Sequence, residues 1–373
     1  MRNRWRTRQS ILYLLDVWLL SLLIKGKAME DYDAVTVLLH DAVTSGLIPG
    51  FVACAGIGED ILYQSYGGYA QLLGETRRMQ PNTMFDVASL TKVMATLPAF
   101  LLLMTKGCLS PDTPISHYFP QYAEGEKKRV RVGHLLSHTA GLVAPQPLLW
   151  QQFSCRSEIV DAALNQPIKN EPGAMVHYSD VGYIILGELI QQETGVPLDT
   201  WTREHIFIPC GMCDTGYNPT NIENIAATEG HGGNAMTGIV HDKTARSMGG
   251  VAGHAGLFST GSDIAHYLML WTGKPHLIHD VLLDQSIVPK YSRTNGNRGW
   301  GWALHGDRQD ISGDGWPHTV ASHTGFTGTS VLFDRPSRVW ACLLTNRVLL
   351  GRTVNIGPLR RAYHTALGRI LFR

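Results

Sequence analysis

The sequence predicts an α/β (α+β) fold, in which an antiparallel sheet flanked by helices is interrupted in sequence by a mainly helical region. Two strand pairs lie near opposite ends of the chain: FVACAGIG with DILYQSYGGYA from residue 51, and GTSVLFD with RVWACLLTN up to residue 346. Between them, residues from about 110 to 290 mix helical patterns and loops. We therefore expect an outer α/β layer that is split around an insertion-like helical middle.

The elements follow in order along the chain. An amphipathic helix is expected from Met29, ended by Gly46 and Pro49, and the first two strands flank Glu59-Asp60 as a hairpin. The apolar run LTKVMATLPAFLLLMTKG predicts a long helix that stops at Gly107. Further helices are expected at SEIVDAALNQ, at VGYIILGELIQQETG with a stop at Gly195, and near residues 357 to 371, after strands that turn at Pro336-Ser337.

Composition is that of a globular protein. The 373 residues are 44% hydrophobic and 17% charged, enough for one large domain or two closely packed ones. The chain has 32 Lys plus Arg and 31 Asp plus Glu. The resulting formal charge of +1 does not indicate a nucleic-acid-binding protein. A small-molecule or cell-wall substrate fits this balance better.

Residues 1–28 form a separate N-terminal segment ahead of a domain expected over 29–373. The basic stretch RNRWRTR precedes an apolar run at residues 11–24, the pattern of an export signal or a membrane anchor. That pattern predicts membrane contact and a place in the cell envelope. The run is interrupted by Asp16 and is shorter than the ~20 residues of a spanning helix. The alternative is translation from Met29, which would leave the protein in the cytoplasm.

The six cysteines are expected to be buried thiols, because most lie far apart in a chain that is too large to need disulfide bonds for stability. Cys210-Gly211-Met212-Cys213 could suggest metal or redox chemistry, but a second ligand pair at zinc-finger spacing is absent. We expect neither a metal nor a cofactor.

Ser89-Leu90-Thr91-Lys92 is the first candidate for chemistry. Serine is a favoured helix N-cap, so Ser89 could simply cap the apolar helix that follows. A lysine three residues later lies on the same helix face, where its amine can reach the serine oxygen. A nucleophilic serine needs such a basic neighbour. Among the lysines of the chain, only Lys92 has a serine three residues before it.

Two further triplets accompany this pair. Tyr178-Ser179-Asp180 stands before a helix, where Ser179 or Asp180 could act as a cap. His323-Thr324-Gly325 leads to the strand GTSVLFD, where the glycine could be an ordinary bend. Each triplet alone is weak, but each occurs once in the chain, and together they form an ordered set.

This set resembles the three active-site motifs of serine β-lactamases and penicillin-binding proteins. The segments MFDVASLTK, VRVGHLLSHTAGL, VHYSDVGYIILGELI, SMGGVAGHAGLFSTGSDIA and SHTGFTGTSVLFD look like successive blocks of the class C β-lactamase-related serine hydrolases, from about Met29 to the C-terminus. That group includes carboxypeptidases, esterases and a muramoyl-alanine amidase. The resemblance implies a β-lactamase/transpeptidase-like fold and no metal.

The resemblance also implies roles for individual residues. Ser89 would attack an amide or ester carbonyl and form an acyl-enzyme, while Lys92 and Tyr178 would handle the proton. The backbone N–H groups of Ser89 and Phe326 would form the oxyanion hole, and Gly325 would let the strand approach the substrate. Thr324 belongs to the same substrate-binding stretch.

Two residues depart from the family pattern. Asp180 stands where Asn is common, and an ionised carboxylate accepts hydrogen bonds but cannot donate one to a substrate carbonyl. Beside Lys92 it should hold the ammonium charged and shift the proton-accepting role towards Tyr178. His323 replaces the Lys that helps bind the carboxylate of penicillin-type substrates. Both changes favour a hydrolase of esters or cell-wall amides over a β-lactamase.

The remaining histidines give weaker signals. His134 and His138 in GHLLSHTAGL could line the cleft, but a helix ending at Gly141 explains their pattern, so a structural role is the favoured interpretation. His231, His241 and His254 lie among glycines without a tight ligand motif, and only His254 is expected to help shape the site.

The resulting prediction is a serine hydrolase that acts through an acyl-enzyme on a peptidoglycan-derived peptide or muramoyl amide, as a carboxypeptidase or an amidase does. Two alternatives remain open: a small-acyl carboxylesterase, and a cell-wall or β-lactam sensor that is acylated without turnover.

Overall fold

The computed structural model describes residues 31–144, 148–229, 234–290 and 295–373. The N-terminal segment 1–28, and the predictions made for it, lie outside these residues. The first helix is present over residues 31–44 and is followed by Gly46, whose φ is 73°. This left-handed conformation favours glycine, which explains why the expected stop works at this position.

A seven-stranded antiparallel sheet forms the centre of the α/β layer. Its order is β3-β2-β1-β12-β11-β10-β9, so the first and last strand pairs of the chain meet where β1 pairs with β12. The strands are β1 (Gly50–Ile57), β2 (Asp60–Gln71), β3 (Arg77–Arg78), β9 (Ala303–Leu304), β10 (Ala321–Thr324), β11 (Ser330–Asp334) and β12 (Val339–Thr345). The expected hairpin, the late strand pair and the split α/β layer are confirmed.

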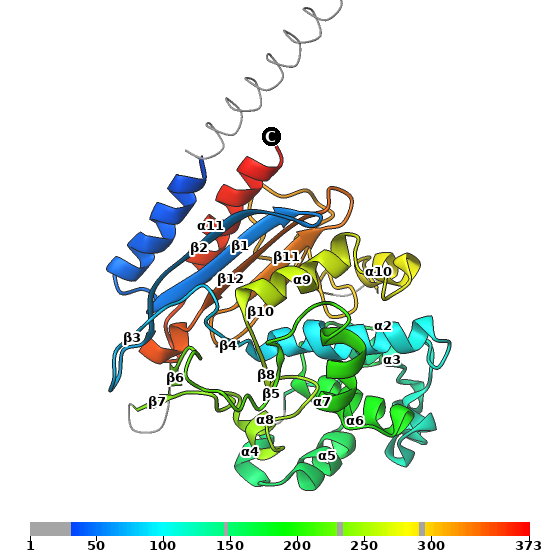
Figure 1. Cartoon of the computed structure of the whole chain (residues 1–373). Coiled ribbons are helices and arrows are strands. Elements are labelled where there is room, and N and C mark those ends of the chain that lie inside the picture. The colour runs from blue at the N-terminus through cyan, green and yellow to red at the C-terminus, as the bar shows by residue number, and fades with distance from the viewer. Residues whose placement is uncertain (1–30, 145–147, 230–233, 291–294) are drawn as a thin grey trace, which may run out of the picture.

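Helices cover both faces of this sheet. In Figure 1, the helix of residues 31–44 and α11 (Gly357–Leu371) lie on one face, and α9 (Gly261–Thr272) lies on the other. Alternate residues of β1 supply the two cores: Phe51 and Ala53 pack with α11, whereas Val52 and Cys54 belong to the core on the opposite side. The period-2 alternation of a strand therefore fixes which residues meet which layer.

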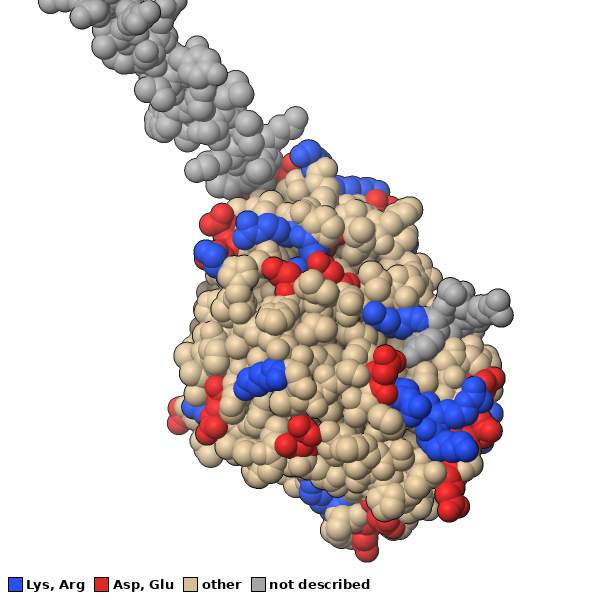
Figure 2. All heavy atoms as spheres, turned by 90° about the vertical axis from the view of Figure 1, so that its right-hand side faces the viewer, with Lys and Arg blue, Asp and Glu red and all other residues tan. Residues whose placement is uncertain are grey.

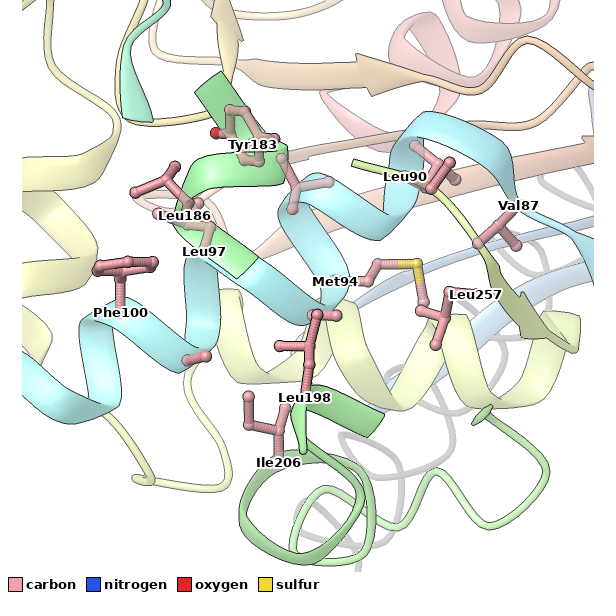
Figure 3. Close-up of a cluster of buried hydrophobic side chains, with 14 of the residues drawn as sticks. Val87, Leu90, Met94, Leu97, Phe100, Tyr183, Leu186, Leu198, Ile206 and Leu257 are labelled. Atoms are coloured by element: carbon pink, nitrogen blue, oxygen red, sulfur yellow. The ribbon is translucent and has the colours of Figure 1, made fainter. Parts of the chain in front are cut away.

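The helical region is built around the segment that carries Ser89. A 3-10 turn (Ala88–Leu90) leads into a π-helical stretch (Lys92–Thr96) and then α2 (Leu97–Thr105), with Pro98 tolerated in the first turn. Figure 3 shows apolar side chains of this segment, including Met94, packed against residues such as Leu186 and Leu198. The stretch Ala88–Thr105 is long and apolar enough to cross a membrane, but 89% of it is buried inside the protein, as in a core helix.

The other helices surround this segment. They are α3 (Val132–Leu136), α4 (Leu149–Gln152), α5 (Arg156–Asn165), α6 (Asp180–Thr194), α7 (Leu198–Thr202), α8 (Lys243–Ser247) and α10 (Asp280–Ser286). The smaller strands are β4 (Phe85–Asp86), β5 (Gly216–Tyr217), β6 (Thr228–Glu229), β7 (Ala235–Met236) and β8 (Leu257–Ser259). The expected helices at SEIVDAALNQ and VGYIILGELIQQETG are confirmed as α5 and α6, and α6 ends at Gly195 with φ 69°.

Ser89 lies inside the 3-10 turn and not at the N-cap of a helix, so the capping alternative for this serine is excluded. One local prediction is wrong. The helix expected to end at Gly141 ends at Leu136, because His138 adopts a φ of 59° and breaks the helix earlier.

Charged side chains of both signs are interspersed on the face shown in Figure 2. This distribution matches the near-zero formal charge of the sequence.

Candidate active site

Ser89 stands on a tightly held turn between β4 and the core helix. The preceding residue, Ala88, has a φ of 48°, a conformation that L-residues other than Asn and Asp rarely adopt. The buried carboxylate of Asp86 holds this turn, because it accepts hydrogen bonds from the N–H groups of Ala88 (2.8 Å) and His241 (2.7 Å). Burial raises the pKa of Asp86 to about 6, although both N–H groups oppose the shift. Local strain thus presents Ser89, which is partly exposed.

Lys92 lies fully buried beneath Ser89. Its Nζ donates to Ser89 Oγ (3.1 Å) and to the carbonyl of His254 (2.9 Å), and it forms an ion pair with Asp180 Oδ1 (2.7 Å). Burial alone would lower the pKa of Lys92, but the charges and hydrogen bonds of Asp180 and Tyr178 outweigh it and raise the pKa above its ordinary value. An ammonium that donates to Ser89 cannot also take the serine proton, so the base must be another group.

Tyr178 is the group best placed for that role. Lys92 Nζ lies 5.1 Å and the Arg298 guanidinium carbon 5.5 Å from the centroid of its ring. The imidazole of His138 stacks on the ring at 4.4 Å, and His323 lies 6.1 Å away, centroid to centroid. Two cations therefore lie beside the ring of Tyr178.

His138 lies against Tyr178 and Ser179, although the sequence favoured a purely structural role for it. Its Nδ1 accepts a hydrogen bond from the N–H of Ser179 (3.1 Å), so the neutral ring carries its proton on Nε2. Burial and the nearby charges of Arg298 and Lys92 hold the pKa of His138 well below its usual range. We interpret it as a neutral platform that orients Tyr178. His134 has the structural role expected of it, because its Nδ1 accepts from the N–H of Arg131 at the start of α3.

His323 is also neutral. Its Nδ1 lies 3.0 Å from the carbonyl of Thr324, which requires Nδ1 to carry the proton and leaves Nε2 as an acceptor. Burial, Arg298 and Lys92 keep the pKa of His323 well below its usual range. A neutral imidazole in this position supplies no positive charge to a substrate carboxylate.

Gly325 lies at a close approach between the sheet and the Ser89 turn. A Cβ at this residue would come within 2.1 Å of Thr329 Oγ1 and 2.4 Å of the carbonyl of Val87. Thr327 and Thr329 donate their hydroxyls to the carbonyls of Asp86 (2.7 Å) and Val87 (3.1 Å). These two hydrogen bonds fasten the turn after β10 to the residues that precede Ser89.

Arg298 is a second residue that the sequence did not single out. It lies in the ordinary-looking stretch NRGWGW, is 4% exposed, and pairs with Asp307 at 3.4 Å. Its Nε and Nη1 have no hydrogen-bond partner among the described residues. No local pattern marks this arginine, because only the fold brings it to Tyr178.

The remaining candidates divide between the site and its surroundings. The three motifs meet in space: Ser89, Lys92, Tyr178 and Asp180 cluster, and the strand with His323, Thr324, Gly325 and Phe326 closes one side. Ser179 stands at the N-cap of α6 without a capping hydrogen bond from its side chain. His254 contributes its carbonyl to Lys92, while His241 stacks on the exposed ring of Phe326 at 5.6 Å. His231 lies outside the described residues.

No group of three or more His, Cys, Asp or Glu side chains that could hold a metal ion occurs within the described parts of the chain. All six cysteines are free thiols; Cys54, Cys210 and Cys342 are buried, but Cys108, Cys155 and Cys213 are exposed, contrary to the expectation of burial.

Comparisons with known proteins agree with this geometry. The family model described as Beta-lactamase matches residues 35–364. The chain is 30% identical over 334 residues to the "Putative D-alanyl-D-alanine carboxypeptidase" of Escherichia coli (77% of this chain and 76% of the relative). It is 31% identical over 313 residues to the "N-acetylmuramyl-L-alanine amidase" of Bacillus subtilis (74% and 71%).

A solved structure has the same architecture. The octameric penicillin-binding protein homologue from Pyrococcus abyssi covers 90% of this chain, and 76% of its own chain is matched, with a TM-score of 0.71 at 17% identity. Such a likeness shows the fold alone. The expected β-lactamase/transpeptidase-like fold is confirmed.

Proposed function

Because the chain belongs to the beta-lactamase family of serine hydrolases, we propose that it hydrolyses an amide of a peptidoglycan-derived peptide through an acyl-enzyme on Ser89. The observation that carries the proposal is the contact of the buried Lys92 ammonium with Ser89 Oγ at 3.1 Å. Together with Tyr178, this contact provides the nucleophile and the proton-transfer group that acyl transfer needs.

In the proposed first half-reaction, the oxygen of Tyr178, as the phenolate, takes the proton of Ser89 while Oγ bonds to the substrate carbonyl carbon. Lys92 remains an ammonium, since Asp180 pairs with it at 2.7 Å. It therefore orients Ser89 and stabilises the negative charge that Tyr178 carries. Tyr178 then returns the proton to the leaving amine as the carbon–nitrogen bond breaks.

In the second half-reaction, water replaces the leaving group. Tyr178 takes a proton from this water, the hydroxide oxygen bonds to the acyl carbon, and Ser89 leaves and recovers the proton. The developing oxyanion would be held in both halves by the N–H groups of Ser89 and Phe326. Neither N–H donates a hydrogen bond within the described residues, so both remain available to a substrate.

The proposed substrate class rests on the names of the relatives, a carboxypeptidase and an amidase of cell-wall peptides. One observation favours a second candidate, a carboxylesterase for small acyl groups. His323 is neutral and supplies no cation, so an uncharged ester would lose nothing at this position. The complete set of Ser89, Lys92 and Tyr178 argues against a sensor without turnover.

A substrate panel tests the proposal. The purified protein is incubated with a muramoyl peptide, a D-alanyl-D-alanine peptide, a short-chain nitrophenyl ester and a penicillin, and product release is followed by mass spectrometry. We expect turnover of at least one cell-wall amide, abolished by Ser89→Ala and reduced at least about a hundredfold by Tyr178→Phe, which keeps the ring but removes the ionisable oxygen. Turnover of the ester alone would select the second candidate, and acylation without release would select the sensor.

For residues 1–28 we retain the proposal of export or membrane anchoring, on the basic stretch and the apolar run at 11–24. Fractionation of cells that produce the full chain, beside a variant starting at Met29, tests it. Equal recovery of both in the soluble fraction would contradict it.

A further inference from the structure

The turn after β10 carries the proposed oxyanion donor and is closed by its own backbone. The N–H of Gly325 donates to the carbonyl of Thr329 (2.8 Å), and the N–H of Gly328 donates to the carbonyl of Gly325 (3.2 Å). Phe326 and Thr327 therefore occupy the two central positions of a tight turn. The N–H of Phe326 belongs to the peptide group whose carbonyl is that of Gly325.

Arg360, in the first turn of α11, hydrogen-bonds to the carbonyl oxygen of this peptide group. Its Nη2 donates to the carbonyls of both Gly325 (2.8 Å) and Thr329 (2.9 Å). Burial, with a smaller contribution from the charge of Arg347, lowers the pKa of Arg360 to about 9, so the guanidinium is still a cation at neutral pH. The mechanism described above does not use this buried charge.

A hydrogen bond from a cation to a peptide carbonyl changes the other end of the same peptide. Resonance couples the C=O and N–H groups, so a proton donor on the oxygen draws electron density from the nitrogen. Chains of hydrogen bonds strengthen one another in this way, and a charged donor gives a stronger bond than a neutral one.

We propose that Arg360 is a positioning residue that strengthens the Phe326 N–H as an oxyanion donor through the carbonyl of Gly325. The inference rests on the proposed function, because it presupposes that a substrate oxyanion forms at this N–H. Arg360 does not touch the substrate. Its contribution should be realised mainly when negative charge develops on the substrate oxygen, and so should appear in kcat more than in KM.

A purely structural role for Arg360 is the competing explanation, and Arg347 provides the matched control. Arg347 Nη2 donates to the carbonyl of Phe326 (2.6 Å) in the same turn. The N–H of that peptide group belongs to Thr327, which is not a proposed oxyanion donor. Both arginines therefore hold the turn, but only Arg360 acts on the peptide of the Phe326 N–H.

The experiment compares Arg360→Met, Arg360→Lys and Arg347→Met with the parent protein. The measurements are kcat and KM for a short-chain nitrophenyl ester, and inhibition by phenylboronic acid, whose boron bonds to a serine oxygen and forms a tetrahedral anion like the reaction intermediate. We expect Arg360→Met to lower kcat and to weaken boronate inhibition by about tenfold each, less than removal of a whole oxyanion donor, with little change in KM. Arg360→Lys, which keeps the charge, should lose less of both.

Arg347→Met should change kcat and boronate inhibition less than about threefold, because the polarised peptide is intact. The inference is overturned if Arg347→Met costs as much as Arg360→Met, or if Arg360→Met lowers kcat without weakening boronate inhibition. If Arg360→Met does not fold, Arg360→Lys is compared with Arg347→Met instead. A loss of kcat and of boronate inhibition that is larger in Arg360→Lys than in Arg347→Met supports the inference. A loss no larger than that of Arg347→Met, or one confined to KM, contradicts it.

Failure of this inference is distinguishable from failure of the proposed function. A fluorophosphonate probe that labels Ser89 in the parent and in all three variants shows that the nucleophile is intact, so a loss then lies in oxyanion stabilisation. Absence of labelling at Ser89 in the folded parent protein would instead remove the proposed function.

Discussion

At the scale of single residues, the pair Lys92–Asp180 is the reason that we propose Tyr178, and not Lys92, as the base. Lys92 is completely buried, and a lone ammonium in that position would tend to lose its proton. The 2.7 Å contact with Asp180 reverses this tendency and keeps Lys92 charged. Asp180 is half-exposed, so solvent weakens the pair, and an ionised carboxylate accepts hydrogen bonds but cannot donate one.

Asp180→Asn should therefore accelerate acylation of Ser89 by penicillins. The introduced amide can donate to the substrate carbonyl, and loss of the carboxylate lowers the pKa of Lys92 because only Tyr178 then opposes the effect of burial. A gained hydrogen bond corresponds to about a tenfold increase in the second-order rate constant, measured with a fluorescent penicillin.

Asp180→Ala separates the two causes, since it removes the charge without adding a donor. An Asn variant that is folded but no faster than the parent would contradict the role assigned to Asp180. We leave His323 unchanged in this test, because a lysine there would add a third buried cation beside Lys92 and Arg298.

At the scale of elements, the site depends on how closely the turn after β10 approaches the turn that carries Ser89. Thr327 and Thr329 bridge the two turns with hydrogen bonds to carbonyls, and Gly325 leaves no room for a side chain. The α/β layer supplies one turn and the core helix of the helical region follows the other. The proposed site therefore forms only where the two regions pack together.

Gly325→Ala should separate these turns. The added methyl group would overlap Thr329 Oγ1 and the carbonyl of Val87, so the backbone must shift, and we expect the free energy of unfolding to fall by about 2–3 kcal/mol, with loss of most activity. Gly216→Ala in β5 is the matched control, because a Cβ there meets nothing within 4 Å. It should change the free energy of unfolding by less than about 0.5 kcal/mol in urea denaturation. Similar effects of the two substitutions would refute the close-approach argument.

At the scale of the whole molecule, periodic segments could be predicted from the sequence, and non-local contacts could not. The hairpin of β1 and β2 and the helix α6 were predictable because their apolar spacing and glycine stops are local signals. The positions of His138 and Arg298 were not, since each reaches Tyr178 only through packing of distant segments. Ser89 was found by its spacing to Lys92, but the strained turn that presents it has no local signature.

Burial of neutral histidines also sets how the stability of the whole molecule depends on pH. Below pH 6.5 the unfolded chain takes up protons on these histidines, while the folded protein, in which their pKa values are lowered, does not. Folding then costs free energy that increases as the pH falls. The described histidines with a lowered pKa are His134, His138, His241, His323 and His364. Asp86 and Asp263, whose pKa values are raised, act in the opposite direction but are fewer.

We therefore expect the free energy of unfolding in urea to be highest above pH 6.5 and to fall by about 2–5 kcal/mol between pH 7.5 and pH 5.5. In the variant His364→Gln, the introduced glutamine cannot ionise. The fall in the free energy of unfolding over this pH interval should therefore be smaller by the contribution of one histidine. A free energy of unfolding that stays constant or rises over the same interval would show that these histidines are not held neutral.

We propose Ser89 as the nucleophile and Tyr178 and Lys92 as the groups that activate it. The most direct measurement is intact-protein mass spectrometry after incubation with a fluorophosphonate probe, followed by peptide mapping of the labelled residue. We expect one adduct per chain, located on Ser89, absent from Ser89→Ala, and formed much more slowly in Tyr178→Phe. An adduct on another residue, or labelling of Ser89→Ala at the rate of the parent, would contradict it.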